Sequence, residues 1–468
     1  MGQVLIQNAL LTATMDDDRR EFSGGHILID GGLITSVGPE ALEVEGAATI
    51  DASGMIVIPG MVNTHHHLFQ TLTRNIPALQ DAGLFQWLMG HYPIWREITP
   101  EAVNLSAKTG LLELMKSGAT TSSDQLYVFP AKTGDELIDA EIAAARELGI
   151  RFQPTRGSMS LGASKGGLPP DDVTQSEDVI GRDAIRLIKR YHDDSAGAMI
   201  RISLAPCSPF SVTRELMEST VRMANEYNLQ IHTHLAETAD EEVYCRQNFN
   251  RRPVAYADDL GWLRSNAWFA HCVFLSDDEI ADLGAAGVGV AHCPTSNMRL
   301  GSGVGRVREL LDSGVNVGLG VDGSASNDSS NMLQEVRNAM LLSRLRDEAY
   351  WLSARDVIHM ATRGGAMALG RTDIGQLAAG KRADIAMFSL NSLEYAGGMS
   401  DPLGALVFTS RLSPVDYLFI DGQLVIQAGQ SQVDEAALIE EHNRHADRML
   451  QAAADATGTD YWKKSDST

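Results

Sequence analysis

Cysteines and long apolar runs are scarce in this sequence. Only four cysteines occur in 468 residues, and no two of them form a Cys-x-x-Cys pair, so a disulfide scaffold is not expected. No run of about 18 apolar residues offers a membrane span. The N-terminus has no basic region followed by an apolar segment, as a secretory signal would. These absences predict a cytoplasmic protein with reduced thiols.

The sequence also has fewer positively than negatively charged residues. The chain has 38 Lys and Arg against 61 Asp and Glu, a formal net charge of −23. Such a surface repels phosphate backbones and anionic lipid headgroups. We therefore expect no nucleic-acid partner and no membrane partner, and look for a small-molecule substrate.

Short apolar runs separated by turn signals occupy both ends of the chain. The segment 26–34 contains Asp30-Gly31-Gly32 between two such runs, which is a hairpin signal. The same pattern returns at 383–388 and 417–426. We expect residues 1–57 and 375–430 to form one small β-sandwich domain.

Between these ends, eight apolar runs alternate with helical stretches. They lie at 56–67, 119–124, 150–156, 200–208, 229–237, 267–274, 288–294 and 315–322. Each run ends in polar residues, where barrel enzymes place their chemistry. An open α/β sheet would show the same alternation, and the positions of His and Asp residues at the ends of the runs favour the barrel. The predicted fold class is α/β: a distorted (β/α)8 TIM-type barrel over 58–374, with a C-terminal helix and tail over 431–468.

Histidines gather at the ends of two predicted strands. His65 and His67 lie at the end of the first run, and alternation along a strand puts both on one face. His232 and His234 end the fifth run and also share a face. Spacing therefore leaves open which of the second pair would bind a metal.

Three further polar residues end predicted strands. Glu237 lies three residues beyond His234, His271 ends the sixth run, and Asp322 ends the eighth. Imidazole and carboxylate groups suit zinc with an open position for water, and the same set accepts iron. Each residue alone could be structural, but together they indicate a metal site.

The chain resembles the amidohydrolase superfamily, in its cytosine/guanine-deaminase-like branch, over nearly its whole length. The motifs that carry the resemblance are PGMVNTHHH at 59–67, HLAET at 234–238, AHC at 270–272, HCPTSN at 292–297, GVDG at 320–323 and GKRAD at 380–384.

This resemblance implies that His65, His67, His234 and Asp322 hold one divalent metal per subunit, Zn²⁺ or Fe²⁺, and that His232 is structural. A binuclear site would need a bridging lysine at the end of the third or fourth strand. Neither 150–156 nor 200–208 contains one.

The resemblance also implies a hydrolytic deaminase that uses a metal-bound hydroxide. Asp322 would take the proton of the water, His271 would polarise the nascent C–O group, and Glu237 would protonate a ring nitrogen. Ammonia then leaves. Barrels of this family commonly associate, so a homo-oligomer is expected.

The stretches 121–130, 155–162, 205–210 and 320–328 are similar to those of bacterial enzymes that convert 8-oxoguanine to urate and ammonia. Gln70 and Arg156 are candidates for pairing with the ring. Cys207 stands where several relatives carry a substrate-contacting histidine. The alternatives are a deaminase of pteridines such as isoxanthopterin, an amino- or chlorohydrolase of triazines, and a non-catalytic binding protein.

Overall fold

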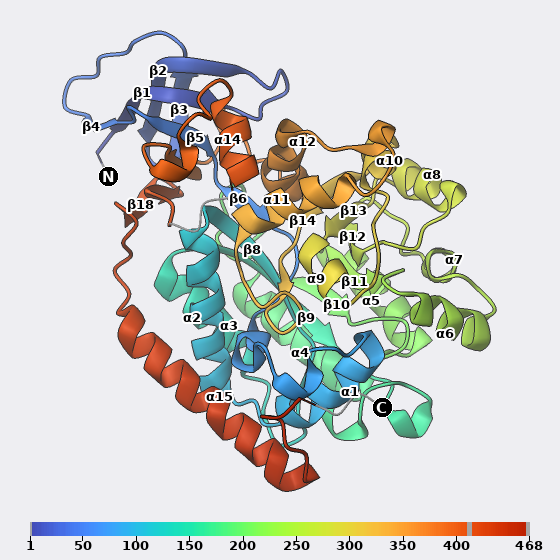
Figure 1. The fold of residues 1–468 in the computed structure, drawn as a ribbon. Helices are drawn as coiled ribbons and strands as arrows, with labels where there is room; N and C mark the ends of the chain where they lie inside the picture. Colours follow the sequence, from blue (N-terminus) through green and yellow to red (C-terminus); the bar gives the residue numbers. More distant parts are fainter. Residues whose placement is uncertain (1, 410–413, 465–468) are drawn as a thin grey trace.

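The protein combines a closed barrel with a smaller sheet built from both ends of the chain. A computed structural model describes residues 2–409 and 414–464. In Figure 1 the first strands and the last strand lie together at one end of the molecule, beside the helix-covered barrel. The predicted α/β class is confirmed. Within the described residues, no helix is long and apolar enough to cross a membrane.

Eight parallel strands close the barrel in the order β10-β11-β12-β13-β14-β6-β8-β9. Every one of the predicted apolar runs overlaps one of them, and β8 and β9 each end two residues beyond the predicted run. Their bounds are β6 (Met61–Asn63), β8 (Ala119–Leu126), β9 (Arg151–Ser158), β10 (Ser203–Pro206), β11 (Ile231–Leu235), β12 (Ala267–His271), β13 (Gly289–His292) and β14 (Asn316–Leu319).

The first predicted run is divided among three strands rather than one. β5 (Met55–Pro59) joins the smaller sheet, β6 joins the barrel, and β7 (His66–His67) pairs with β15 (Asp322–Gly323). The break falls at Gly60, where a Cβ would collide with the side chain of Thr120. The predicted domain boundary after residue 57 therefore lies inside β5.

The smaller sheet has the strand order β18-β17-β16-β5-β1-β2-β3, with β4 paired to β1. Its β2–β3 connection is the predicted hairpin at Asp30-Gly31-Gly32. The strands are β1 (Val4–Ala13), β2 (Glu21–Asp30), β3 (Leu33–Gly38), β4 (Ala48–Asp51), β16 (Ile385–Ser389), β17 (Tyr417–Ile420) and β18 (Gln423–Gln427). Both chain ends thus contribute to it, as the sequence predicts.

Helices follow most barrel strands. They are α1 (Leu84–Trp95), α2 (Pro100–Lys116), α3 (Leu137–Leu148), α4 (Glu177–Tyr191), α5 (Arg214–Tyr227), α6 (Ala239–Phe249), α7 (Pro253–Asp259), α8 (Asp277–Ala286), α9 (Pro294–Arg299), α10 (Val307–Asp312), α11 (Met332–Ser343), α12 (Ala354–His359), α13 (Gly365–Ala368), α14 (Pro402–Thr409) and α15 (Glu435–Thr457). The helix α14 lies within the part of the chain predicted as β only.

The C-terminal helix α15 packs along α2 on the outside of the barrel (Figure 1). Lys116 Nζ of α2 lies 2.6 Å from a carboxylate oxygen of Glu435. Further along, His442 Nε2 lies 2.9 Å from Thr71 Oγ1, in the short helix η1 (Leu68–Thr73). The helix therefore braces the segment that follows the first histidines.

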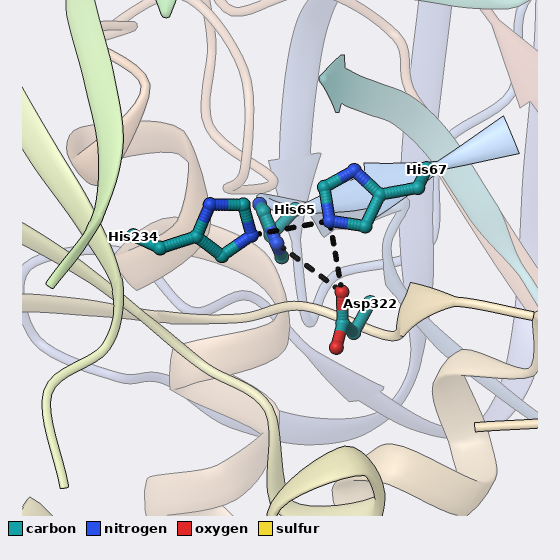
Figure 2. Close-up of side chains that lie close together, drawn as sticks. All are labelled: His65, His67, His234 and Asp322. Carbon is teal, nitrogen blue, oxygen red and sulfur yellow. Dashed lines mark hydrogen bonds and ion pairs between the residues drawn. The ribbon is translucent and has the colours of Figure 1, made fainter. Parts of the chain in front are cut away.

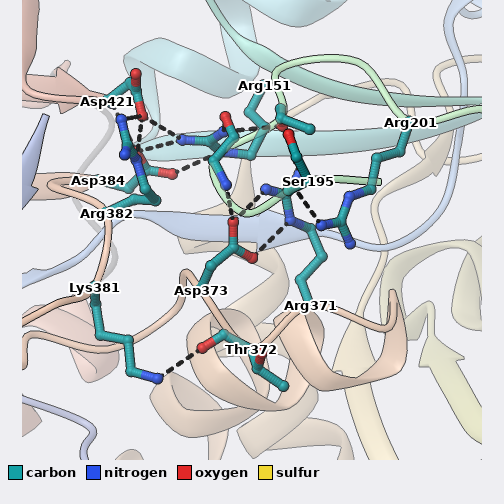
Figure 3. A network of polar contacts seen from close by, with 12 residues as sticks. Arg151, Ser195, Arg201, Arg371, Thr372, Asp373, Lys381, Arg382, Asp384 and Asp421 are labelled. Carbon is teal, nitrogen blue, oxygen red and sulfur yellow. Dashed lines mark hydrogen bonds and ion pairs between the residues drawn. The ribbon is translucent and has the colours of Figure 1, made fainter. Parts of the chain in front are cut away.

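A buried ionic network joins the barrel to the smaller sheet (Figure 3). Arg151, the first residue of β9, lies 3.1 Å from the carboxylate of Asp384, and the two side chains are 0% and 1% exposed. A second carboxylate, that of Asp421, contacts both Arg151 and Arg382. Charges so well buried stay stable only while they are paired.

Arg151→Met is expected to lower the free energy of unfolding by about 3–5 kcal/mol, because it leaves Asp384 buried without its cation. Chemical denaturation measures this. The control is Arg190→Met, whose partner Asp139 lies 2.9 Å away while Arg190 itself is 62% exposed, and which should cost less than about 1 kcal/mol. Equal losses in the two variants would contradict a special role for the buried pair.

Candidate active site

Four buried side chains converge at the carboxyl ends of the barrel strands (Figure 2). They are His65, His67, His234 and Asp322, and one ligand-type atom of each lies within 4.8 Å of the others. Asp322 Oδ1 lies 3.3 Å from His65 Nε2 and 3.2 Å from His67 Nε2. His67 Nε2 lies 3.1 Å from His234 Nε2.

Backbone carbonyls fix the proton positions on two of these rings. His67 Nδ1 lies 2.7 Å from the carbonyl oxygen of Gln125, and His234 Nδ1 lies 2.7 Å from that of Cys207. Because a carbonyl only accepts, each neutral ring carries its proton on Nδ1 and directs a lone pair from Nε2. Two lone pairs facing each other at 3.1 Å are stabilised by a cation between them.

His232 fixes the proton position on the third ring of the cluster, that of His65. Its Nδ1 lies 2.8 Å from the carbonyl oxygen of Trp268, so its Nε2 is free to accept the proton of His65 Nδ1 at 2.8 Å. His65 Nε2 then also directs a lone pair, and it has no hydrogen-bond partner in the structure. The donor set fits a divalent metal ion, and His232 lies outside it, behind His65.

The carboxylate of Asp322 is oriented by two hydroxyl groups. Ser296 Oγ and Ser326 Oγ donate to its Oδ2 at 2.6 and 2.9 Å, which leaves Oδ1 toward the imidazoles. The backbone of Asp322 has φ +62°, a left-handed conformation that is uncommon outside glycine. His271 and Ala236 share it, with φ +71° and +54°. Such strain clusters at functional sites.

Burial and the mutual contacts set the charges of the cluster. Burial lowers the pKa of His65 and of His234 well below the usual value, which keeps both rings neutral. Burial alone would raise the pKa of Asp322, but the close imidazoles of His65 and His67 outweigh it and hold that pKa well below its usual value. A neutral imidazole and an ionised carboxylate are the forms that bind metals.

A cavity of about 410 Å³ opens over the cluster. Its apolar wall comes mainly from α1, and its polar wall from the ends of the barrel strands. The apolar residues are Leu84, Trp87, Leu88, Tyr92, Phe210 and Leu300, and the polar ones include Gln70, Tyr127, Cys207, Ser208, Glu237, His271 and Ser326. A mostly apolar pocket with a few polar groups is typical of a small-molecule site.

Glu237 and His271 lie beside one another in the cavity wall, outside the metal-type cluster. His271 Nε2 lies 3.8 Å from Glu237 Oε1, and His271 Nδ1 lies 3.1 Å from Asn297 Oδ1. Burial, together with the charge of Asp322, raises the pKa of Glu237 to about 8. A carboxyl group that holds its proton near neutral pH is suited to act as a general acid.

Gln70 reaches the cavity from η1. Its Nε2 donates to the hydroxyl oxygen of Tyr127 at 3.2 Å, while its buried Oε1 has no partner. Gly323 makes room for this amide, since a Cβ at that position would collide with it. No sequence pattern predicted the contact between Gln70 and Gly323, because Gln70 follows the first predicted strand and Gly323 follows the eighth.

Cys207 lines the cavity, and burial raises the pKa of its thiol to about 12. The thiol therefore stays neutral. Its carbonyl oxygen is the acceptor for His234 Nδ1, so this residue acts on the cluster through its backbone.

Arg156 does not line the cavity with the other predicted residues. It points outward from β9, where its Nε lies 2.5 Å from Asp183 of α4 and its guanidinium lies over the ring of Phe129. The strand continues to Ser158, so Arg156 is not its last residue, and alternation puts it on the outer face. The structure thus gives it a packing position instead of a substrate contact.

Comparison with known proteins places the chain in a family. Residues 56–425 match the amidohydrolase family. An 8-oxoguanine deaminase from Pseudomonas aeruginosa is 44% identical over 452 residues, which cover 96% of this chain and 100% of the relative. An isoxanthopterin deaminase from an unknown prokaryotic organism is 36% identical over 444 residues, covering 90% and 92%.

A solved structure shares the fold and carries a metal. The crystal structure of an atrazine chlorohydrolase from Arthrobacter aurescens TC1, complexed with zinc, has a TM-score of 0.90 at 36% identity, covering 95% of this chain and 100% of the other. The chain therefore belongs to the amidohydrolase family. It is a hydrolase that acts on C–N bonds.

Proposed function

We propose that this protein deaminates an aminated purine-like ring, with 8-oxoguanine as the substrate. Water replaces the ring amino group, so 8-oxoguanine and water give urate and ammonia. The observation that carries the proposal is the 44% identity to an 8-oxoguanine deaminase along that relative's full length. We further propose a cytoplasmic homo-oligomer.

One Zn²⁺ per subunit is the proposed cofactor, held by His65, His67, His234 and Asp322, with Fe²⁺ as the alternative. The zinc in the related chlorohydrolase supports this choice, as does the absence of lysine from β9 and β10. When bound, such a metal lowers the pKa of a coordinated water from 15.7 to about 7.

The side chains around the cluster divide the proton transfers. Asp322 accepts the proton of the attacking water, and Glu237 donates a proton to a ring nitrogen. His271 already donates its Nδ1 proton to Asn297, so its Nε2 polarises the nascent C–O group only with a second proton.

Substrate recognition is assigned to Gln70 and to the apolar wall. The unpartnered Oε1 of Gln70 is an acceptor for a ring N–H, and the side chains of α1 accept the faces of a planar ring. Cys207 is smaller than histidine and leaves room for the 8-oxo group.

Gly323→Ala is expected to raise KM about tenfold, because the new methyl group displaces the Gln70 amide and one hydrogen bond of about 1.4 kcal/mol is lost. Steady-state kinetics with metal analysis measures this. Gly181→Ala in α4 is the control, since a Cβ there meets nothing within 4 Å. An unchanged KM in Gly323→Ala would remove Gln70 from substrate recognition.

The substrate is tested by comparing kcat/KM for 8-oxoguanine, guanine, isoxanthopterin and hydroxyatrazine by ammonia or amine release. We expect 8-oxoguanine to be preferred, since a site built to pair the polar edges of one ring rejects rings that leave them unpaired. Isoxanthopterin is the second candidate, favoured by the 36% identity to its deaminase. Negligible turnover of 8-oxoguanine beside efficient turnover of another member would overturn the proposal.

A further inference from the structure

A buried carboxylate holds the backbone that carries Glu237. Glu241 lies in the first turn of α6 and is 0% exposed. Its Oε1 accepts a hydrogen bond from the backbone N–H of Ala236 at 2.9 Å, and its Oε2 accepts one from that of Glu237 at 2.8 Å. The two oxygens thus bind two successive peptide groups directly after β11.

This arrangement differs from an ordinary helix cap. In a capping box the acidic residue three positions into the helix accepts from the N–H of the capping residue itself. Glu279 of α8 does this, accepting from Ser276 N at 2.8 Å. Thr238 caps α6 in the same way as Ser276 caps α8. Glu241, however, reaches past Thr238 to the two residues before it.

The turn that Glu241 binds needs a restraint. Ala236 has φ +54°, which costs an alanine free energy that glycine would not lose. Its carbonyl oxygen is held from the other side, by the N–H groups of Val273 and Phe274 at 2.9 Å each. Together these bonds fix the peptide planes on both sides of Ala236.

The side chain of Glu241 accepts hydrogen bonds from these two backbone amides and has no cationic partner within the described residues. It takes part in none of the ion pairs found among residues 2–409 and 414–464. Burying a carboxylate without a cation is costly unless its oxygens are hydrogen-bonded. The two backbone bonds offset part of that cost, since burial still raises the pKa of Glu241 to about 7. They lie at the base of the Glu237 side chain, which enters the cavity.

We propose that Glu241 is a positioning residue that aims Glu237 at the substrate. The proposal rests on the proton-transfer role of Glu237 in the proposed function. Without both bonds, the peptide groups of Ala236 and Glu237 rotate away from each other and the Glu237 carboxyl group leaves its place beside His271. A misplacement of about 1 Å costs roughly 10²-fold in rate.

The test is a double-mutant cycle of Glu241→Gln and Glu237→Gln, measured as kcat, KM and metal content on the metal-loaded protein. The glutamine amide presents only one acceptor, so one of the two N–H groups loses its partner. We expect Glu241→Gln to keep its metal and lower kcat about 10- to 100-fold, with KM within about threefold. In the Glu237→Gln background the same change should alter kcat less than about twofold.

Glu279→Gln is the matched control. It removes a carboxylate from the same position of the next strand–helix unit, away from the cavity, and should lower the melting temperature while kcat stays within about twofold. Equal losses of kcat from Glu241→Gln in both backgrounds, or an equal loss from Glu279→Gln, would show that the effect does not pass through Glu237 and would overturn the proposal.

The outcomes also separate this proposal from the proposed function. Wild-type turnover in Glu237→Gln would remove the acid role on which both depend. A large loss in Glu237→Gln with unchanged kcat in Glu241→Gln would overturn only the positioning role. If Glu241→Gln does not purify as a folded protein, Glu241→Asp keeps the charge but shortens the reach, and the same loss of kcat is expected. Failure of both to fold would assign Glu241 to stability and overturn the proposal.

Discussion

Glu237→Gln is expected to lower kcat by about 10²- to 10⁴-fold, the usual contribution of a general acid or base, while the metal content is unchanged. Glu237 is 3% exposed and lines the cavity, but it is not one of the four clustered metal-type residues. Glutamine keeps the shape of the side chain and has no proton to give. Single-turnover kinetics with metal analysis separates the chemical step from binding.

His232→Gln is the control for this prediction. His232 lies next to the same strand end, and its Nε2 accepts from His65, a bond that a glutamine oxygen can also accept. We expect it to lose about tenfold, the low end of the range for a residue that holds a metal-type ligand, because glutamine keeps the acceptor for His65. If both variants were equally damaged with metal retained, the division of roles between these residues would be wrong.

Strand ends were the most predictable part of the site. The two faces of a strand alternate, and the carboxyl ends of parallel strands meet on one side of a barrel. The strand pattern therefore predicted that His65 and His67, one or both of His232 and His234, and Asp322 lie together, and the resemblance to the amidohydrolase superfamily selected the set His65, His67, His234 and Asp322. Spacing could not choose between His232 and His234, because both face the same side. The positions of the two Nε2 atoms distinguish them: that of His232 lies 2.8 Å from His65 Nδ1, behind the cluster, and that of His234 lies 3.1 Å from His67 Nε2, within it.

Contacts between distant segments were the least predictable part. Tyr127 and Leu300 line the cavity, although each lies about three residues beyond a predicted run or motif and the sequence assigned neither a role. For Arg156 the sequence predicted a substrate contact, from its charge and its place near a strand end, but the residue does not line the cavity. A strand two residues longer than expected moves it from the rim to the outer face. Glu241 is a missed residue with a sequence signal, because Thr238-x-x-Glu241 is the pattern of a capping box.

Exhaustive chelation is expected to abolish turnover, and one Zn²⁺ per subunit is expected to restore it. Without a cation, three imidazole lone pairs and an ionised carboxylate face each other within 4.8 Å in a buried site. The Nδ1 protons of His65, His67 and His234 are directed to other acceptors. Burial disfavours the charged form of His67, but the carboxylate of Asp322 outweighs it and raises the pKa of that ring, so in the chelated protein a proton on His67 replaces only part of the missing positive charge. The cation therefore stabilises the fold as well as the reaction.

The same experiment has a readout independent of activity. A ligand that binds only the folded state raises the free energy of unfolding by RT ln(1 + [L]/Kd), about 2.7 kcal/mol at 100-fold excess over Kd. The melting temperature of the chelated protein should thus rise as zinc is added and stop rising at one equivalent. Fe²⁺ tested in parallel shows which metal supports the higher kcat. Full activity after chelation, or a plateau near two metals per subunit, would contradict the mononuclear site, because the four clustered residues supply ligands for one ion only.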